Sequence, residues 1–360
     1  MTHRNRSELP TWIVIAAIYG GWLTLTFFFR DLPAYLVAPL GAWLLAWHGS
    51  LQHEALHGHP TRRPRLNALI AGPPLALWLP FPIYRESHMA HHRAQELTDP
   101  FEDPESYYTA PEEWALLSRP VRLLRRALQT AAGRLLLGPF AVVWRLLAAE
   151  ARRVASGDLR RLAIWAVHAA AVSAVLFWVV AICRIPIGAY LALFVYPGLS
   201  LTLLRSFTEH RPGEDQVQRT AVVEAGPLLS LLYLHNNLHV VHHLWPQLPW
   251  YELPGLYRAQ RRSLLEQNGH FAFAGYAEVL RRYALRTKDS PIHRRPAGSP
   301  GRRGERSARG VLEGARAGFS GMWSQRAARE VVQRLASPRR RSGRSSFGAP
   351  GAAPASEAGA

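Results

Sequence analysis

The chain has 360 residues, and its 43 lysines and arginines outnumber its 25 aspartates and glutamates, which gives a formal net charge of +18. So basic a chain is typical of a nucleic-acid binder, but 48% hydrophobic and only 19% charged residues argue against that as the first interpretation. The single cysteine, Cys183, excludes an internal disulfide framework and a cysteine-based zinc module. We expect no cleaved signal peptide, because no short apolar stretch with a cleavage site opens the chain.

Four stretches with almost no charge predict membrane-spanning helices, since about 17–25 apolar residues cross a bilayer. They cover residues 11–29, 33–47, 162–183 and 185–204. Short connections at Arg30-Asp31-Leu32 and at Arg184 pair them as two hairpins. A fifth apolar stretch, residues 67–84, contains four prolines, which break the helical hydrogen-bond ladder. We therefore expect it to be re-entrant or to lie on the membrane surface.

The basic residues predict which side of the membrane each part faces. The N-terminus, the 51–161 loop and the C-terminal region carry most of them, and the positive-inside bias puts these parts in the cytoplasm. Residues 116–161 hold ten arginines among Leu, Trp and Val at helical spacing. This pattern favours amphipathic helices on an anionic leaflet, with ordinary solvated helices as the alternative.

The last part of the chain has a different composition. Residues 291–360 are rich in Arg, Gly, Ala, Ser and Pro, and 14 arginines against four glutamates leave a net charge of +10. We expect a disordered tail. The predicted organisation is therefore a membrane domain over residues 1–290 and a tail over residues 291–360.

The histidines gather in three short stretches that hold 11 of the 16 in the chain. Their cores are His53-Glu-Ala-Leu-His57, His88-Met-Ala-His91-His92 and His239-Val-Val-His242-His243. On a helix, residues i and i+4 share a face, and residue i+3 lies beside them. Eight converging imidazoles are too many for one metal but suit two. Imidazole binds Zn, Cu, Fe or Ni, and so large a set without cysteine fits a pair of irons better than structural zinc.

At these motifs the chain resembles the membrane fatty acid desaturase superfamily, the histidine-box di-iron desaturases and hydroxylases. The resemblance covers roughly residues 12–283 and includes the 31-residue step from His57 to His88. It also includes Thr98-Asp-Pro…Asp103-Pro-Glu105-Ser106 after the second box and Leu248-Pro-Trp250-Tyr251 after the third. It implies an all-α integral membrane fold, in which four transmembrane helices lie under a cytoplasmic helical cap that holds a di-iron site.

The resemblance also implies a ligand set. Some members take a ninth ligand from the cytoplasmic end of the fourth span, where this chain has His210. The implied catalytic residues and metal ligands are His53, His57, His88, His91, His92, His239, His242 and His243, with His210 as a further metal ligand.

Other residues near the boxes have open roles. Some members place an asparagine four residues before the ninth ligand, and this chain has Ser206 there, so Asn236 or Asn237 is the substitute candidate. His235 is either a ligand or a hydrogen-bond partner, whereas His48 and His59 are expected to support the ligands or to lie at the interface. Candidates to accept ring N–H bonds are Glu54, Asp99 and Glu209.

The implied chemistry is oxidation of a lipid. Breaking an unactivated C–H bond takes an oxidant made from O2 and two electrons, which acid–base side chains do not supply. We expect two iron ions, O2 as co-substrate and an external electron donor such as ferredoxin or a cytochrome b5-like protein. The substrate is expected to be a lipid acyl chain entering from the bilayer past Trp43, Trp78, Phe81 and Tyr84, residues that are alternatively interfacial anchors.

The leading hypothesis is an O2-dependent fatty acid desaturase in a bacterial inner membrane, with its active site on the cytoplasmic side. A lipid or carotenoid hydroxylase or ketolase with the same site is the first alternative. A zinc transporter or storage protein would carry its ligands inside the spans rather than beside them. No nucleic-acid partner is expected, although a tail that binds DNA stays an alternative.

Overall fold

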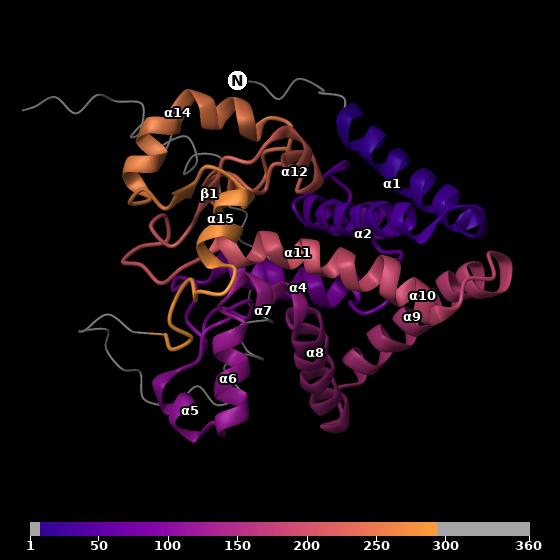
Figure 1. Ribbon diagram of the computed structural model, residues 1–360, viewed down its shortest axis with the longest axis horizontal. Coiled ribbons are helices and arrows are strands. Elements are labelled where there is room, and N and C mark those ends of the chain that lie inside the picture. Colours follow the sequence, from indigo (N-terminus) through magenta and orange to yellow (C-terminus); the bar gives the residue numbers. More distant parts are fainter. Residues whose placement is uncertain (1–7, 294–360) are drawn as a thin grey trace, which may run out of the picture. The chain divides into compact units, whose positions relative to one another are not determined.

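The computed structural model describes residues 8–293, and the predicted tail therefore lies outside the described residues from residue 294 onward. The described residues belong to the first of two units into which the chain divides, Met1–Ala297. They are mostly helical (Figure 1). The helices are α1 (Leu9–Phe27), α2 (Ala34–Leu56), α3 (Pro64–Ala71), α4 (Phe81–Arg93), α5 (Pro111–Leu116), α6 (Arg119–Ala127), α7 (Ala131–Leu136), α8 (Gly138–Ala155), α9 (Leu159–Leu176), α10 (Ile187–Tyr190), α11 (Tyr196–Glu209), α12 (Pro227–Leu232), α13 (His239–Leu244), α14 (Leu253–Gln267) and α15 (Tyr276–Tyr283).

Three described helices are long and apolar enough to cross a membrane: Leu9–Phe27, Leu159–Ile182 and Ile187–Glu209. The second continues α9 through a π-helical segment, η2 (Phe177–Ile182), and the third joins α10 to α11 through another, η3 (Leu191–Val195). These three match predicted spans within a few residues. The remaining predicted span, residues 33–47, lies in α2, a 23-residue helix whose later half carries polar side chains and which does not reach the same hydropathy. Its crossing of the membrane stays a prediction.

Helix α2 packs closely against the third long helix. Gly41 faces η3, where an added Cβ would stand 2.7 Å from the Phe194 ring. Gly198 faces α2 in the same way, because its added Cβ would stand 2.8 Å from Cβ of Leu45. Small residues at helix crossings let the backbones approach, as is typical of membrane helices. The two crossings fix α2 beside α11, so the ends of both helices reach the same region (Figure 1).

The proline-rich stretch, residues 67–84, is not one continuous helix, and its re-entrant or surface position stays a prediction. It divides into α3 and α4, with an irregular connection between them. Side chains from the long helices satisfy carbonyls in this connection. Tyr190 donates its hydroxyl to the carbonyl of Leu75 at 2.7 Å, and the Nε2 atom of His168 lies 3.0 Å from the carbonyl of Leu77. These contacts give the irregular backbone hydrogen-bond partners within the protein itself.

Helices α5–α8 cover the arginine-rich region of the sequence. They expose several large apolar side chains, among them Leu123 (64%), Phe140 (67%) and Trp144 (74%). Asp158 ends this region by capping α9, since its carboxylate accepts a hydrogen bond from the amide of Arg161. Exposed apolar residues among arginines fit the predicted contact with an anionic leaflet, which stays a prediction.

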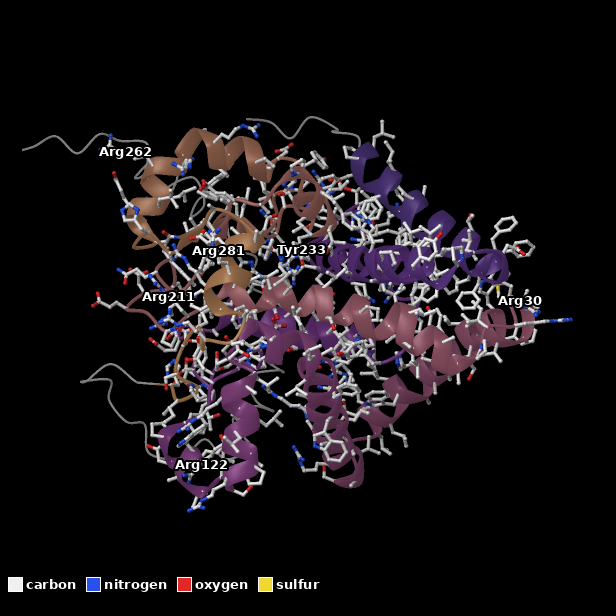
Figure 2. The ribbon with its side chains drawn as sticks, in the orientation of Figure 1. Arg30, Arg122, Arg211, Tyr233, Arg262 and Arg281 are labelled. Atoms are coloured by element: carbon white, nitrogen blue, oxygen red, sulfur yellow. The ribbon has the colours of Figure 1, made fainter. Side chains whose placement is uncertain are left out.

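The chain after α11 forms a small layer around two paired strands. The strands β1 (Val222–Val223) and β2 (Ala272–Phe273) pair in parallel, α13 packs against β1, and α14 packs against α13. A buried cluster that includes Phe207, Tyr233 and Tyr276 ties this layer to α11. Figure 2 shows Arg211, Arg262 and Arg281 on this side of the molecule, whereas Arg30 lies at the far end of the long helices.

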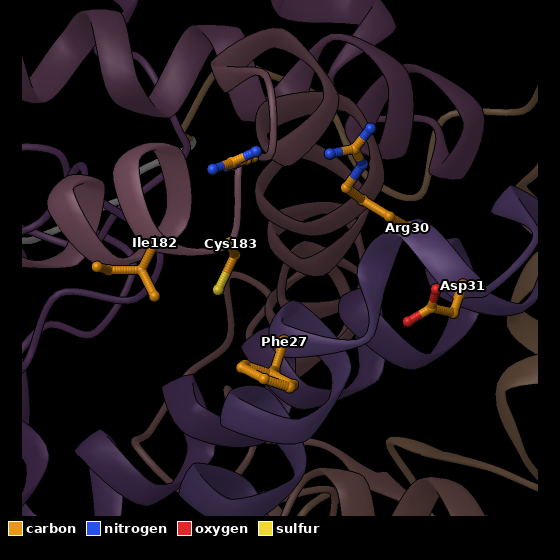
Figure 3. Close-up of a pocket in the computed structure, with 6 residues that line it drawn as sticks. Phe27, Arg30, Asp31, Ile182 and Cys183 are labelled. Carbon is orange, nitrogen blue, oxygen red and sulfur yellow. The ribbon is translucent and has the colours of Figure 1, made fainter.

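The hairpin turns are at the ends of the long helices away from the histidines. Between the two turns lies a pocket lined by Phe27, Arg30, Asp31, Ile182, Cys183 and Arg184 (Figure 3). Because α1, α2 and α11 each reach the histidine region with their other ends, this pocket is separate from the predicted site.

Candidate metal centre

The structure brings all nine predicted ligands together in two neighbouring groups. The five-histidine group consists of His53, His57, His88, His92 and His242. The four-histidine group consists of His91, His210, His239 and His243. Within each group the possible ligand atoms lie within 4.8 Å of one another. The two groups touch, because the rings of His92 and His243 stack with their centroids 4.5 Å apart.

Helical spacing explains why each HxxHH motif serves both groups. On α4, His88 and His92 are four residues apart on one face and join the five-histidine group, while His91 turns to the four-histidine group. On α13, His239 and His243 share the four-histidine group and His242 joins the other. Each motif therefore divides its histidines between the two groups.

The first box reaches the centre differently. His53 lies within α2, but His57 is the residue at which that helix ends, so the two do not share a continuous helical face. His210 follows the last residue of α11 with an extended backbone. Both His57 and His210 therefore owe their direction to the ends of long helices, which the packing of α2 against α11 holds in place.

The Nε2 atoms are spaced as ligands of a metal would be. In the five-histidine group, Nε2 of His88 lies 3.1 Å from Nε2 of both His57 and His92. In the four-histidine group, Nε2 of His210 lies 3.1 Å from that of His91 and 3.0 Å from that of His239. Two nitrogens about 2.1 Å from one metal and at right angles would stand about 3.0 Å apart. The donor set therefore fits a pair of metal ions.

The charge state of the imidazoles also suits metal binding. Burial and the neighbouring histidines lower the pKa of His57, His92, His242 and His243. Burial, with the charge of His91 beside it, lowers the pKa of His210 to about 3. These rings are therefore neutral at physiological pH, which is the form that binds a metal.

His91 is the exception. Burial alone lowers its pKa, but the hydrogen bond to Asp103 and the nearby carboxylates outweigh burial and raise it to about 9. A metal in the four-histidine group would therefore displace a proton from His91.

Carboxylates and an amide hold the far side of several rings. The Nδ1 atom of His91 donates to Asp103 at 2.8 Å, and Nδ1 of His88 lies 3.3 Å from Glu105. His239 donates its Nδ1 proton to the side-chain oxygen of Asn236 at 2.8 Å. Such contacts fix the tautomer that leaves Nε2 as the atom able to bind a metal.

Of the three residues predicted to accept ring N–H bonds, two lie near a histidine of the boxes and the third hydrogen-bonds within a loop. Glu209 lies 3.5 Å from Nδ1 of His239, and Glu54 lies 3.7 Å from Nδ1 of His53. Asp99 instead accepts bonds from the amides of Phe101 and Glu102, so it shapes the loop after α4.

The other open candidates can now be located. Asn236 stands beside both groups, because its amide nitrogen also lies 3.3 Å from Nε2 of His53. Asn237 donates to the carbonyl of Val223 and so holds strand β1. The ring of His235 stacks on Trp250, outside both groups. Ser206 lies 3.3 Å from the hydroxyl of Tyr107.

Comparison with known proteins agrees with this geometry. The model of the family described as "Fatty acid desaturase" matches residues 30–275, which is more than half of the chain. The chain belongs to the fatty acid desaturase family. A β-carotene ketolase of Paracoccus sp. is 26% identical over 261 residues, which cover 67% of this chain and 90% of the ketolase. This member of the desaturase family is therefore an oxidoreductase of the desaturase and hydroxylase type.

Sequence reasoning missed two contacts in this desaturase-family protein. Asp103 and Glu105 belong to the resemblance but had no predicted role, although they are the carboxylates nearest to Nδ1 of His91 and His88. Their signal was available, since both follow the second box within 17 residues. The direction of their side chains depends on the turn at Thr98, which has a positive φ of 74°.

Proposed function

We propose that the protein is an O2-dependent di-iron fatty acid desaturase, which introduces a double bond into the acyl chain of a lipid. The observation that carries the proposal is the pair of touching histidine groups, five and four, with carboxylates behind their rings. A bound iron pair would supply the oxidation of an unactivated C–H bond with O2 and two electrons. Neutral imidazole is a suitable ligand for iron, and the described groups contain no cysteine.

The residues of this chain hold the site in shape. Asp103, Glu105 and Asn236 orient one ring each, so the Nε2 atoms of His91, His88 and His239 keep fixed directions. Burial partly shields the site from water, since His53, His91 and His242 are 2% exposed or less. The remaining ligand candidates include four half-buried rings, those of His57, His92, His210 and His243. A rigid, partly shielded site favours controlled oxidation of the substrate over side reactions.

The substrate that fits this site is long and apolar. Tyr84 on α4 lies against the ring of His88, with centroids 5.7 Å apart, and Phe81 one turn earlier is buried. These two residues support an approach along α4 from the bilayer side. Trp78 and Trp43, which the sequence also suggested, remain candidates for the same path.

Ketolation or hydroxylation is the second candidate, and the relative that is named a β-carotene ketolase favours it. Both reactions would use the same histidine groups. Small displacements of the substrate relative to the site decide whether a second hydrogen leaves or an oxygen is added. The family match and the ketolase match therefore support one kind of site with two possible products.

Product analysis distinguishes the two candidates. The full chain is expressed in a lipid-producing host, with a second set of cells that makes carotenoids, and extracted lipids are examined by mass spectrometry. An acyl chain that has lost two hydrogen atoms supports the desaturase. A product that has gained an oxygen supports the second candidate. The His91→Ala variant is the control and should give neither product, because it removes a histidine of the four-histidine group.

The protein is proposed to act at the cytoplasmic face of a bacterial inner membrane and to receive electrons from a carrier. The charge distribution supports this orientation, because residues 116–161 hold ten arginines and two of them contact the histidine region. Arg161 pairs with Glu86 on α4, the helix of the second histidine box, and Arg145 donates to the carbonyl of Ser106 in the loop after it. An acidic ferredoxin or a cytochrome b5-like protein suits such a basic region. Cross-linking of the purified protein to each carrier, at low and high salt, would identify the donor.

A further inference from the structure

Residues 284–293, here called the closing segment, return from α15 to the loop that follows α4. The amide of Thr109 donates to the carbonyl of Pro291, and the amide of His293 donates to the carbonyl of Thr109, both at 2.9 Å. Earlier in the segment, the amide of Lys288 donates to the carbonyl of Gln129 at 2.8 Å. The family match ends at residue 275, so this segment lies outside the matched residues.

Lys288 connects the closing segment to His210. It is the only lysine in the chain. Its side chain is 5% exposed, and its Nζ atom donates to the main-chain carbonyl of His210 at 2.6 Å. Asp289 balances the charge at 3.1 Å, and the rings of Phe207 and Phe271 lie within 6 Å. A buried ammonium is costly unless it is paired, so this arrangement holds the His210 backbone firmly.

His293 connects the same segment to His91 through the loop after α4. Its Nε2 atom lies 3.1 Å from the hydroxyl of Thr98, and both residues are buried. The amide of Thr98 donates to Asp103, which in turn accepts the Nδ1 proton of His91. Thr98 has a positive φ, which a β-branched residue adopts only when its surroundings hold it. The contact with His293 is one of those restraints.

Both connections end on the same group of histidines. His210 and His91 belong to the four-histidine group, and their Nε2 atoms lie 3.1 Å apart. We propose that the closing segment is a positioning element for the four-histidine group, through Lys288 on His210 and through His293 on Asp103 and His91. Its loss weakens one of the two metal positions and leaves the other in place. The inference rests on the proposed function only in that the two groups hold metals.

The test is a metal titration of the purified full-length protein in detergent, with Fe(II) under anaerobic conditions. Wild type should bind two ions per chain. Lys288→Met should weaken one of the two binding steps by about 10–100-fold, the usual effect of removing a group that orients a ligand. The other step should be unchanged. Lys288→Arg, which keeps the cation, should recover part of the loss. Arg261→Met, which removes a cation that pairs with Glu224 on another surface, should change neither step.

The outcomes separate the inference from the proposed function. A wild type that binds no pair of ions contradicts the proposed function. A wild type that binds two, with variants that weaken both steps equally or neither, contradicts the inference. If Lys288→Met does not fold, His293→Gln provides the comparison through the second connection, because it alters the contact with Thr98 and leaves Lys288 in place.

A second measurement uses Lys288 as a chemical probe. Coupling between two sites is reciprocal, so a metal that depends on the closing segment must also hold that segment in place. Acylation of Lys288, localised by peptide mass spectrometry, should be about 10–100-fold slower after Fe(II) loading, matching the change in affinity. An acylation rate that metal loading does not alter would overturn the inference.

Discussion

Replacement of Asp103 by asparagine should weaken the four-histidine group selectively. The carboxylate is 2% exposed and accepts three hydrogen bonds, from His91 Nδ1 and from the amides of Thr98 and Glu105. The amide group keeps the volume but removes the charge, and it turns a donor toward one of these three donors. Removing a partner that orients a ligand costs about 10–100-fold in metal affinity, which corresponds to about 1.4–2.8 kcal/mol. A charge-assisted hydrogen bond of about 1.5–3 kcal/mol gives the same range.

The matched variant is Glu105→Gln. Glu105 lies farther from its histidine, 3.3 Å from Nδ1 of His88, and its side chain is 31% exposed. The variant should therefore weaken metal binding by less than about tenfold. The assay is an Fe(II) titration of both variants, with circular dichroism to verify that each is folded. The reasoning fails if Glu105→Gln weakens binding as much as Asp103→Asn, or if Asp103→Asn binds both ions as wild type does.

Three further variants test the packing and the electrostatics around the site. Arg205→Met should destabilise the protein by about 3–5 kcal/mol, because it removes the guanidinium that lies 2.8 Å from the buried carboxylate of Glu209. The double variant with Glu209→Leu should recover most of the lost unfolding free energy, measured by unfolding in detergent. Gly41→Ala should lower the thermal unfolding temperature, since its Cβ meets a ring at 2.7 Å, and an unchanged temperature would contradict the close crossing of α2. Glu8→Gln should lower the free energy of unfolding by about 1 kcal/mol between about pH 4.5 and 6.5, because it removes the ion pair with His59. Despite burial, the hydrogen bond between the two side chains raises the pKa of His59 and lowers that of Glu8. The difference in unfolding free energy between variant and wild type should therefore shrink as pH rises through the folded pKa of His59. It should also shrink as pH falls through the folded pKa of Glu8.

The sequence identified the histidines but not the loops that orient them. Helical spacing at i, i+3 and i+4 is a local property, so the motifs at His88 and His239 could be recognised without a structure. The contact between Asp103 and His91 depends on the turn at Thr98, whose positive φ the sequence does not indicate. Lys288 lies 78 residues from His210, and its role depends wholly on tertiary packing.

The membrane helices were predictable in proportion to their apolar content. Three predicted spans became helices long and apolar enough to cross a bilayer, because an uncharged stretch is itself the signal. Helix α2 gave a weaker signal, since one helix carries both an apolar half and His53 with its polar neighbours. The sequence predicted a short span over residues 33–47, whereas the helix continues to Leu56.

The spread of the histidines along the chain sets an order for biogenesis. Both groups combine residues from α2 or α4 with residues of α13, and His53 and His242 are separated by nearly two hundred positions. Synthesis proceeds from the N-terminus, so the long helices are made before α13 exists. Neither group can be completed on a nascent chain that still lacks α13. A metal in either group can therefore take its full set of ligands only after α13 has been made, and the closing segment is the last described piece of the chain to be synthesised.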